Sequence, residues 1–308
     1  MFQIMEATNK YIIAELRISI SFAGGQTNGC HLLPSFEPFR VTDDVFYQSD
    51  DIFFSMYVDD NIHPIAKEKR ERIKEVDTGN GITIVDQTDD GGYQFIIKNI
   101  YGAACCLLQT NKDFNVCRCA LNGTETMRTF GLNNALMLAF AFAGCKRDVV
   151  LIHASLVRKD GWGYAFTAKS GTGKSTHVSM WLRHIPGCDL MNDDNPIIRI
   201  IDGKSYIYGG PWSGKTPCYR NIKARLGAVV SINRESTNHV EPLSVVGAFA
   251  MLISACSSMK WDKGVVDSIC NIITKIIETT PPYALYCRPD KEAAIVCQKA
   301  ITRNEKSV

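Results

Sequence analysis

The sequence of 308 residues predicts an α/β protein of two domains, a β-rich N-terminal domain (1–147) and an α/β domain (148–308). Three observations predict this fold class. The first half contains short runs rich in Ile, Val, Tyr, Phe and Cys, separated by turn residues. In the second half, strand-like runs are mixed with helical ones. A glycine-rich segment there lies between an apolar strand and a helix.

The N-terminal domain is expected to contain short strands and one closing helix. Turn signals lie at residues 23–25, 89–92 and 122–123. The charged run 67–74 is interpreted as a solvated loop or the rim of a sheet. The helix ends at Gly144. The expected strands are 11–21, 52–58, 81–85, 93–100, 104–108 and 115–120, and the expected helix is 129–143.

The second domain is expected to alternate strands and helices, with turns at residues 159–161 and 202–204. A proline and a glycine at 186–187 end its first helix. The expected strands are 149–157, 162–167, 188–191, 196–201, 205–208, 228–232 and 283–286, and the expected helices are 174–184, 243–256, 265–278 and 291–301.

Composition excludes several classes of function. Apolar residues make up 45% and charged residues 21%, which is typical of a globular protein. The net charge of +2 does not suggest a nucleic-acid or membrane partner. The longest apolar stretches, 135–145 and 245–256, fall short of the roughly 18 residues that cross a bilayer. The 12 cysteines lack zinc spacing, and residues 1–10 lack an export signal, so reduced thiols in the cytoplasm are expected.

Residues 168–175, Ala-Lys-Ser-Gly-Thr-Gly-Lys-Ser, nearly fit the phosphate-binding loop (P-loop) pattern G-x-x-x-x-G-K-[ST]. We call this segment the glycine-rich loop. Ala168 replaces the first glycine of the pattern, which matters only if that position needs a positive φ. Gly171 and Gly173 allow the backbone N–H groups to approach phosphate oxygens closely. The following helix directs its positive end at the same anion.

The loop therefore predicts a site for ATP with a divalent metal, Mg²⁺ or Mn²⁺. Lys174 is expected to neutralise the outer phosphates, and Ser175 to bind the metal. The nucleotide-binding residues are predicted to be Ser170, Gly171, Thr172, Gly173, Lys174, Ser175 and Thr176.

Asp193 and Asp194 follow the next short strand. If that strand is a parallel neighbour of the strand before the loop, both carboxylates reach the sheet edge where the phosphates lie. One carboxylate can then hold the metal, and the other can accept a proton from an attacking hydroxyl. The alternative is a solvated turn, because residues 192–196, Asn-Asp-Asp-Asn-Pro, are typical turn formers.

A second candidate loop, residues 211–215, follows a strand and ends in a cation, Lys215. It could close over the phosphates, with Lys215 stabilising charge in the transition state.

Residues 149–215 resemble the catalytic domain of the bacterial HPr kinase/phosphorylase family and its shorter relatives, in a similarity that spans roughly residues 130–300. The matching segments, in order, are 152–155 (Ile-His-Ala-Ser), 169–176 and 192–194 (Asn-Asp-Asp). Segments 208–215 and 281–290 resemble the shorter relatives. Phosphoenolpyruvate carboxykinases share a similar loop and acidic pair.

The resemblance implies an ATP-dependent kinase that acts on a serine hydroxyl with a divalent metal, and it implies His153 near the phosphates. Similarity to the carboxykinases implies Asp193 as the base and Asp194 as a metal ligand beside Ser175. The segment with which HPr kinase engages HPr is not found, so HPr is not the expected acceptor.

The predicted function is transfer of the γ-phosphoryl group of ATP to a hydroxyl, with serine expected, on a peptide, a protein or a small molecule. Two alternatives remain open: a nucleotide-binding switch without turnover, and an enzyme of the carboxykinase type. The sequence names neither the acceptor nor the oligomeric state, so a homo-oligomer stays open.

Overall fold

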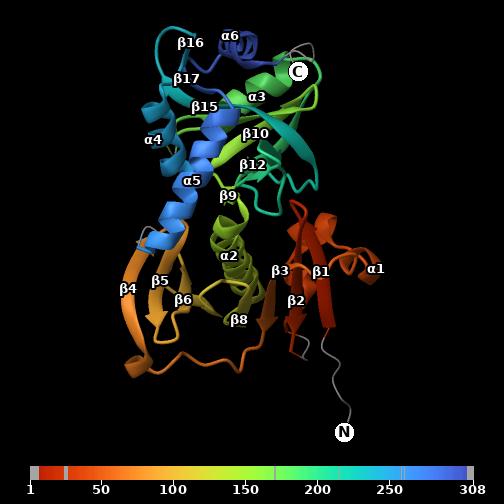
Figure 1. The fold of residues 1–308 in the computed structure, drawn as a ribbon, viewed down its shortest axis with the longest axis vertical. Coiled ribbons are helices and arrows are strands. Elements are labelled where there is room, and N and C mark those ends of the chain that lie inside the picture. Colours follow the sequence, from red (N-terminus) through yellow and green to blue (C-terminus); the bar gives the residue numbers. More distant parts are fainter. Residues whose placement is uncertain are drawn as a thin grey trace. The chain divides into compact units, whose positions relative to one another are not determined.

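The computed structural model describes residues 7–23, 27–169, 171–214, 216–257, 259 and 261–303. The chain forms a mixed α/β structure with two sheets (Figure 1). It divides into two compact units, Met1–Ala143 and Gly144–Val308. This division falls a few residues before the domain limit of 147 expected from the sequence.

In the N-terminal unit, the described residues form one eight-stranded sheet, in the order β1-β2-β3-β8-β7-β6-β5-β4. Strand β3 is parallel to both of its neighbours, β2 and β8, and the other pairings are antiparallel. The strands are β1 (Ala7–Ile13), β2 (Leu16–Phe22), β3 (Ile52–Val58), β4 (Arg70–Asp77), β5 (Gly81–Thr88), β6 (Tyr93–Asn99), β7 (Ala104–Thr110) and β8 (Val116–Leu121), and the helices are α1 (Asp43–Phe46) and α2 (Glu125–Gly144).

Helix α2 packs on this sheet through aromatic side chains. Phe140 meets Phe53 of β3 edge-on, with ring centroids 5.2 Å apart. Phe142 lies 5.3 Å from Phe114 and 6.3 Å from Phe95 of β6. Edge-to-face and offset pairs of this kind add to the free energy gained by burying the rings. The core of the unit therefore lies between α2 and the sheet.

Two features of the N-terminal unit test the sequence predictions. The single strand expected at 11–21 is wrong, because Ala14 and Glu15 take positive φ (50° and 63°) and form a two-residue hairpin turn between β1 and β2. Positive φ at both turn residues suits a two-residue hairpin, but Asn or Gly usually occupies such positions. Ala14 and Glu15 are neither, so the sequence carried no turn signal. The interpretation of the charged run 67–74 as the rim of a sheet is confirmed, because β4 lies at the end of the strand order.

A buried carboxylate ties the connection before β4 to the sheet. Asp86 of β5 is 1% exposed and forms ion pairs with Arg70 and Arg72. The side chain of Gln94 donates to Asp86 at 3.3 Å and accepts from the backbone N–H of Ile65 at 2.8 Å. A buried charge of this kind is tolerated because it is paired and hydrogen-bonded.

The C-terminal unit contains one mixed sheet, in which nine strands are described (Figure 1). Seven follow the order β12-β10-β11-β15-β14-β13-β9, and β17 joins β16 to β15. The strands are β9 (Val149–Leu151), β10 (Ala154–Lys159), β11 (Trp162–Thr167), β12 (Cys188–Asp194), β13 (Ile197–Ile201), β14 (Lys204–Tyr208), β15 (Lys223–Arg234), β16 (His239–Pro242) and β17 (Pro282–Cys287), and the helices are α3 (Lys174–His184), α4 (Val245–Ala255), α5 (Lys263–Thr279) and α6 (Lys291–Ile301).

Side-chain caps start three of these helices. Ser244, Asp262 and Asp290 each accept a hydrogen bond from a backbone N–H in the first turn of α4, α5 and α6. Such caps satisfy a donor that the helix itself leaves free. Helix α3 starts differently, with Gly173 at its N-cap and no side-chain hydrogen bond.

The path of the chain around β10 differs from the prediction. The strand expected at 149–157 breaks at His153, whose backbone N–H donates to the carbonyl of Ala255 at 2.8 Å. The condition that β12 is a direct parallel neighbour of β11 is not met, since β10 lies between them and is antiparallel to both. Because β10 is antiparallel to both, β11 and β12 run in the same direction and still end at the same edge of the sheet.

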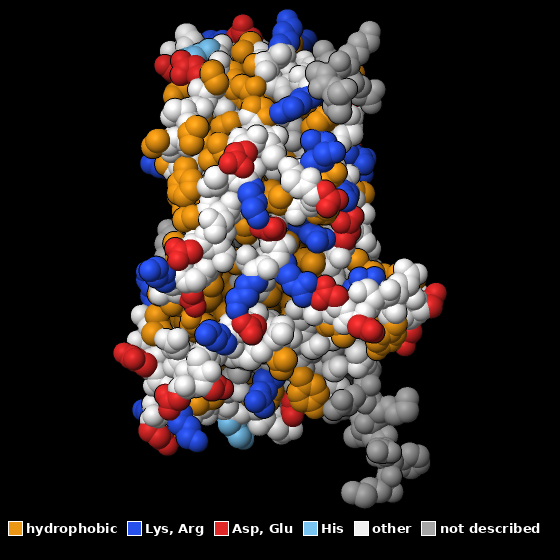
Figure 2. All heavy atoms as spheres, viewed as in Figure 1, with side chains coloured by type: hydrophobic (Ala, Val, Ile, Leu, Met, Phe, Trp, Pro, Cys, Tyr) orange, Lys and Arg blue, Asp and Glu red, His pale blue; other side chains and the backbone are white. Residues whose placement is uncertain are grey.

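The surface and the cysteines agree with the composition. On the face drawn in Figure 2, Lys and Arg are interspersed with Asp and Glu. The 12 cysteines are free thiols, most of them buried. No helix in the described part of the chain is long and apolar enough to cross a bilayer.

His177 is a core residue of the C-terminal unit and is 4% exposed. Its ring lies 4.9 Å from that of Phe166, and its Nε2 accepts a hydrogen bond from Trp181 at 3.0 Å. Burial lowers the pKa of His177 from 6.5 to about 4. The imidazole is therefore neutral in the folded protein at neutral pH.

We expect acid to destabilise the fold through His177. The unfolded chain takes up this proton below pH 6.5 and the folded chain only below about pH 4, so stability is lost as the pH falls between these values. The loss amounts to roughly 3 kcal/mol. Urea unfolding at pH 7 and pH 4.5, followed by Trp fluorescence, should show a smaller pH effect in His177→Gln than in the wild type. Equal pH effects in both proteins would contradict this assignment.

Candidate active site

The glycine-rich loop connects β11 to α3 and depends on two glycines. Gly171 and Gly173 have φ of 76° and 119°, in the left-handed region that side chains rarely adopt. Ala168 is not among the residues with positive φ, so the methyl group that replaces glycine there causes no backbone strain. Ser170, one of the predicted nucleotide-binding residues, lies outside the described residues.

Arg234 holds the loop from the end of β15. Its guanidinium donates to the carbonyl of Gly171 at 2.6 Å and to that of Thr172 at 3.0 Å. The side chain is exposed, and ordering an exposed arginine costs side-chain entropy. Sequence reasoning missed this residue, because the strand was expected to end at 232 and no motif marks a distant arginine that binds loop carbonyls.

The acidic pair lies in the last two positions of β12 instead of following the strand. Asp193 is 5% exposed, and its Oδ1 accepts hydrogen bonds from Ser175 at 3.1 Å and from Ser155 at 2.6 Å. The neighbouring side chain of Asp194 points to another partner, His153, and is 33% exposed. The alternation of side chains along a strand separates the two carboxylates in this way.

His153 connects Asp194 to the loop lysine. Its Nδ1 lies 3.0 Å from Oδ1 of Asp194, and its Nε2 lies 2.8 Å from Nζ of Lys174. An ammonium group can only donate, so Nε2 accepts and Nδ1–H donates to the carboxylate. This pair of contacts places the donor proton of His153 on Nδ1.

Lys174 is close to both carboxylates. Burial lowers the pKa of Lys174, while the charges of Asp194 and Asp193 oppose that effect. The ammonium also donates to the carbonyl of Ala168 at 3.4 Å. The structure thus brings these residues into two adjacent sets of polar contacts: Ser175 with Asp193, and Lys174 with His153 and Asp194.

The second candidate loop runs beside the acidic pair. The backbone N–H of Gly214 donates to the carbonyl of Asp193 at 2.7 Å, and Ser213 forms a bridge with Asp194. A Cβ at Gly214 would come within 2.7 Å of the Asp193 carbonyl, so only glycine fits this approach. Lys215, the predicted catalytic cation of this loop, lies outside the described residues.

A cavity of about 790 Å³ opens beside the glycine-rich loop. His153, the loop, the end of β15 and α4 line it. Its described lining includes two cationic side chains, Lys169 and Arg234, and no carboxylate. This volume lies within the range of small-molecule sites, and the positive charge of the lining side chains suits an anionic ligand.

The donor set also fits a hard divalent cation. Ser175, Asp193 and Asp194 supply hydroxyl and carboxylate oxygens, the ligand type that Mg²⁺ and Mn²⁺ prefer. No cluster of three or more His, Cys, Asp or Glu side chains able to hold a metal occurs among the described residues. Mg²⁺ is commonly held by one or two protein ligands together with substrate phosphates, and this site matches that case.

Comparison with known proteins leaves the family open. No protein-family model and no curated protein matches the chain. Among solved structures, the HPr(Ser) kinase/phosphatase from Coxiella burnetii is similar over 48% of this chain and 86% of its own, with a TM-score of 0.30 and 8% sequence identity. This distant similarity does not establish a family, substrate or reaction.

Proposed function

We propose that the C-terminal unit binds ATP with Mg²⁺ or Mn²⁺ and transfers the γ-phosphoryl group to a hydroxyl. The sequence resemblance implies that this hydroxyl belongs to a serine. The observation that carries this proposal is the set of contacts joining Lys174 and Ser175 of the loop to Asp193, Asp194 and His153. Phosphoryl transfer needs positioning and charge stabilisation around the phosphates and the metal, and these residue types supply both.

The loop and the start of α3 would hold the phosphates. Positive φ at Gly171 and Gly173 lets the backbone curve closely around an anion, and the helix dipole favours negative charge at the N-terminus of this 11-residue helix. Lys174 would turn from His153 to the outer phosphates. Arg234 would add positive charge while it keeps the loop carbonyls in place.

Ser175 and Asp193 would hold the metal, which neutralises phosphate charge when bound. A hydroxyl has one proton, and Ser175 donates it to Asp193, so its lone pairs remain available to a cation. This contact favours Asp193 as the partner of Ser175, in contrast to the Asp194 assignment that resemblance implies.

Asp194 and His153 would then accept the proton of the acceptor hydroxyl. The carboxylate receives Nδ1–H of His153 at 3.0 Å and an amide N–H of Asn195 at 2.7 Å, which orient both groups. His153 lines the cavity, so a hydroxyl bound there would lie beside this member of the pair. A base placed within hydrogen-bond reach of the attacking hydroxyl is what the transfer requires.

Labelling of an extract tests the function. The purified protein is incubated with γ-labelled ATP, Mg²⁺ and a cell extract freed of small nucleotides, and labelled species are resolved and identified. We expect a labelled acceptor with the wild type and none with Lys174→Ala. ATP binding with no labelled species and no ADP would instead indicate a nucleotide switch. Label exchange that requires oxaloacetate or phosphoenolpyruvate would indicate a carboxykinase.

A further inference from the structure

Ser155 is a buried polar residue in an otherwise apolar stretch of β10. It is 1% exposed, as buried as its neighbours Ala154, Leu156 and Val157. Burying a hydroxyl costs free energy unless a partner satisfies it, and an apolar side chain would suit such a strand better for stability alone. The partner of Ser155 is Asp193, its register neighbour on β12, at 2.6 Å.

The same oxygen of Asp193 accepts a hydrogen bond from a second hydroxyl. Oδ1 accepts from Ser155 on one strand and from Ser175 at the start of α3, at 3.1 Å. Ser155 lies in the sheet, whereas Ser175 lies at the end of the glycine-rich loop. The carboxylate thus connects a fixed hydroxyl in the core to the hydroxyl placed to meet a cation.

We infer that Ser155 is a positioning residue that fixes Asp193 and, through it, the orientation of the Ser175 hydroxyl toward a nucleotide-bound divalent metal. This inference rests on the proposed function. Ser155 holds Oδ1 in one place, so that oxygen can receive the proton of Ser175 and leave the serine lone pairs to the cation. Ser155 itself touches neither metal nor nucleotide in this arrangement.

Equilibrium binding tests the inference without catalysis. The affinity of full-length protein for a non-hydrolysable ATP analogue is measured with Mg²⁺ and with a chelator. In Ser155→Ala, we expect the gain in affinity due to Mg²⁺ to fall by about 10-fold or more, the size of one hydrogen bond to a charged group. Affinity in the chelator should stay within about 2-fold, because the loop and Lys174 are intact.

Ser205 provides a matched control. It is also 1% exposed and lies in the same unit, on β14, where its hydroxyl is 2.6 Å from that of Thr279. Ser205→Ala removes the hydroxyl of an equally buried serine, far along the sheet order from the acidic pair. It should lower the unfolding temperature in a similar way to Ser155→Ala and leave the Mg²⁺ effect unchanged.

Two further variants keep the outcome decisive. Ser155→Cys retains the size of the side chain with a weaker donor, and it should lose less of the Mg²⁺ effect than Ser155→Ala. In an Asp193→Ala background, Ser155→Ala should cause no additional loss. A normal Mg²⁺ effect in folded Ser155→Ala, or an equal loss in Ser155→Cys and Ser155→Ala, overturns the positioning role while leaving the proposed function intact. Absence of any Mg²⁺ effect in the wild type overturns both.

Discussion

Asp193→Asn and Asp194→Asn are expected to separate metal binding from chemistry. Asn keeps nearly the shape of Asp and removes its charge. Asp194→Asn should still bind ATP with Mg²⁺ but lose phosphoryl transfer by about 10²–10⁴-fold, the range for a positioned base. Asp193→Asn should lower transfer and also the Mg²⁺-dependent part of nucleotide affinity, because Asp193 orients Ser175. Transfer rates and ATP affinities measured with and without Mg²⁺ distinguish the two roles.

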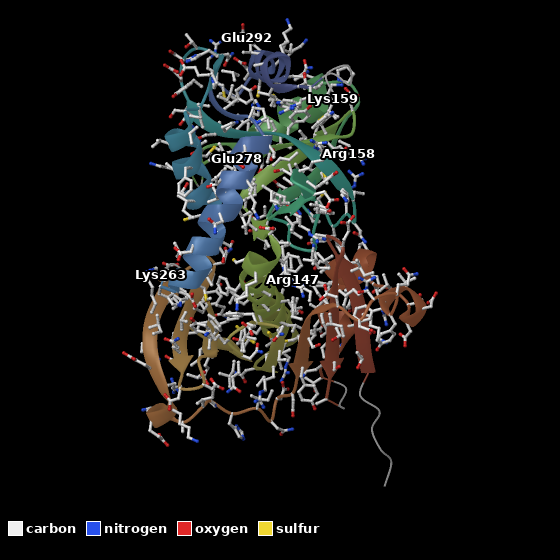
Figure 3. All side chains as sticks on the ribbon, viewed as in Figure 1. Arg147, Arg158, Lys159, Lys263, Glu278 and Glu292 are labelled. Carbon is white, nitrogen blue, oxygen red and sulfur yellow. The ribbon has the colours of Figure 1, made fainter. Side chains whose placement is uncertain are left out.

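Asp189 supplies the control for this pair. It lies on the same strand and forms ion pairs with Arg158, labelled in Figure 3, and with Arg220, each at 2.8 Å. Asp189→Asn should reduce neither Mg²⁺-dependent affinity nor transfer by more than about 2-fold, since its partners are outside the set of contacts around Lys174. Wild-type transfer in both Asp193→Asn and Asp194→Asn would leave the acidic pair without a catalytic role and favour the nucleotide switch. A reversed pattern would restore the assignment that the carboxykinases imply.

Lys174→Ala is expected to abolish detectable turnover and to weaken ATP binding. The ammonium lies between His153 and the start of α3, where it would meet the outer phosphates. Removal of one preorganised charge donor costs about 10²–10³-fold in rate, and loss of a phosphate contact adds a loss in affinity. Equilibrium binding of ATP and the rate of ADP formation measure the two effects.

Lys159→Ala is the matched lysine variant. Lys159, labelled in Figure 3, lies at the end of β10 and pairs with Asp160 at 2.7 Å. It is a similar cation in the same unit that takes no part in the contacts around the loop, so its replacement should leave nucleotide binding and turnover unchanged. If Lys174→Ala binds and turns over ATP as the wild type does, the glycine-rich loop is not the phosphate site.

Local signals were sufficient for much of the C-terminal unit. Strand β11, helix α3 and helix α6 have the bounds that the sequence predicts. In each case the periodicity of apolar residues ends at a strong stop or start signal, such as the glycine before Lys174 or the Asp290 cap. These signals act within a few residues, so they can be read without knowing the rest of the fold.

The surroundings of the site depend on hydrogen bonds between residues that are far apart in the sequence. The break at His153 arises from a hydrogen bond to Ala255, and the contact between Arg234 and the glycine-rich loop joins residues more than sixty positions apart. Sequence spacing alone carries no sign of either contact. The hairpin turn at Ala14 and Glu15 was missed for a different reason, because its residue types are unusual for that conformation.

The sequence by itself determined the α/β class, the glycine-rich loop between strand and helix, and the residues from which a phosphate and metal site could be built. Only the tertiary structure decided how they combine. Strand β10 lies between β11 and β12, Asp193 accepts hydrogen bonds from two serines, and Asp194 pairs with His153. The physical reason is that local propensities act over a few residues, whereas the partner of each carboxylate is set by strand order and register, which depend on packing of the whole unit.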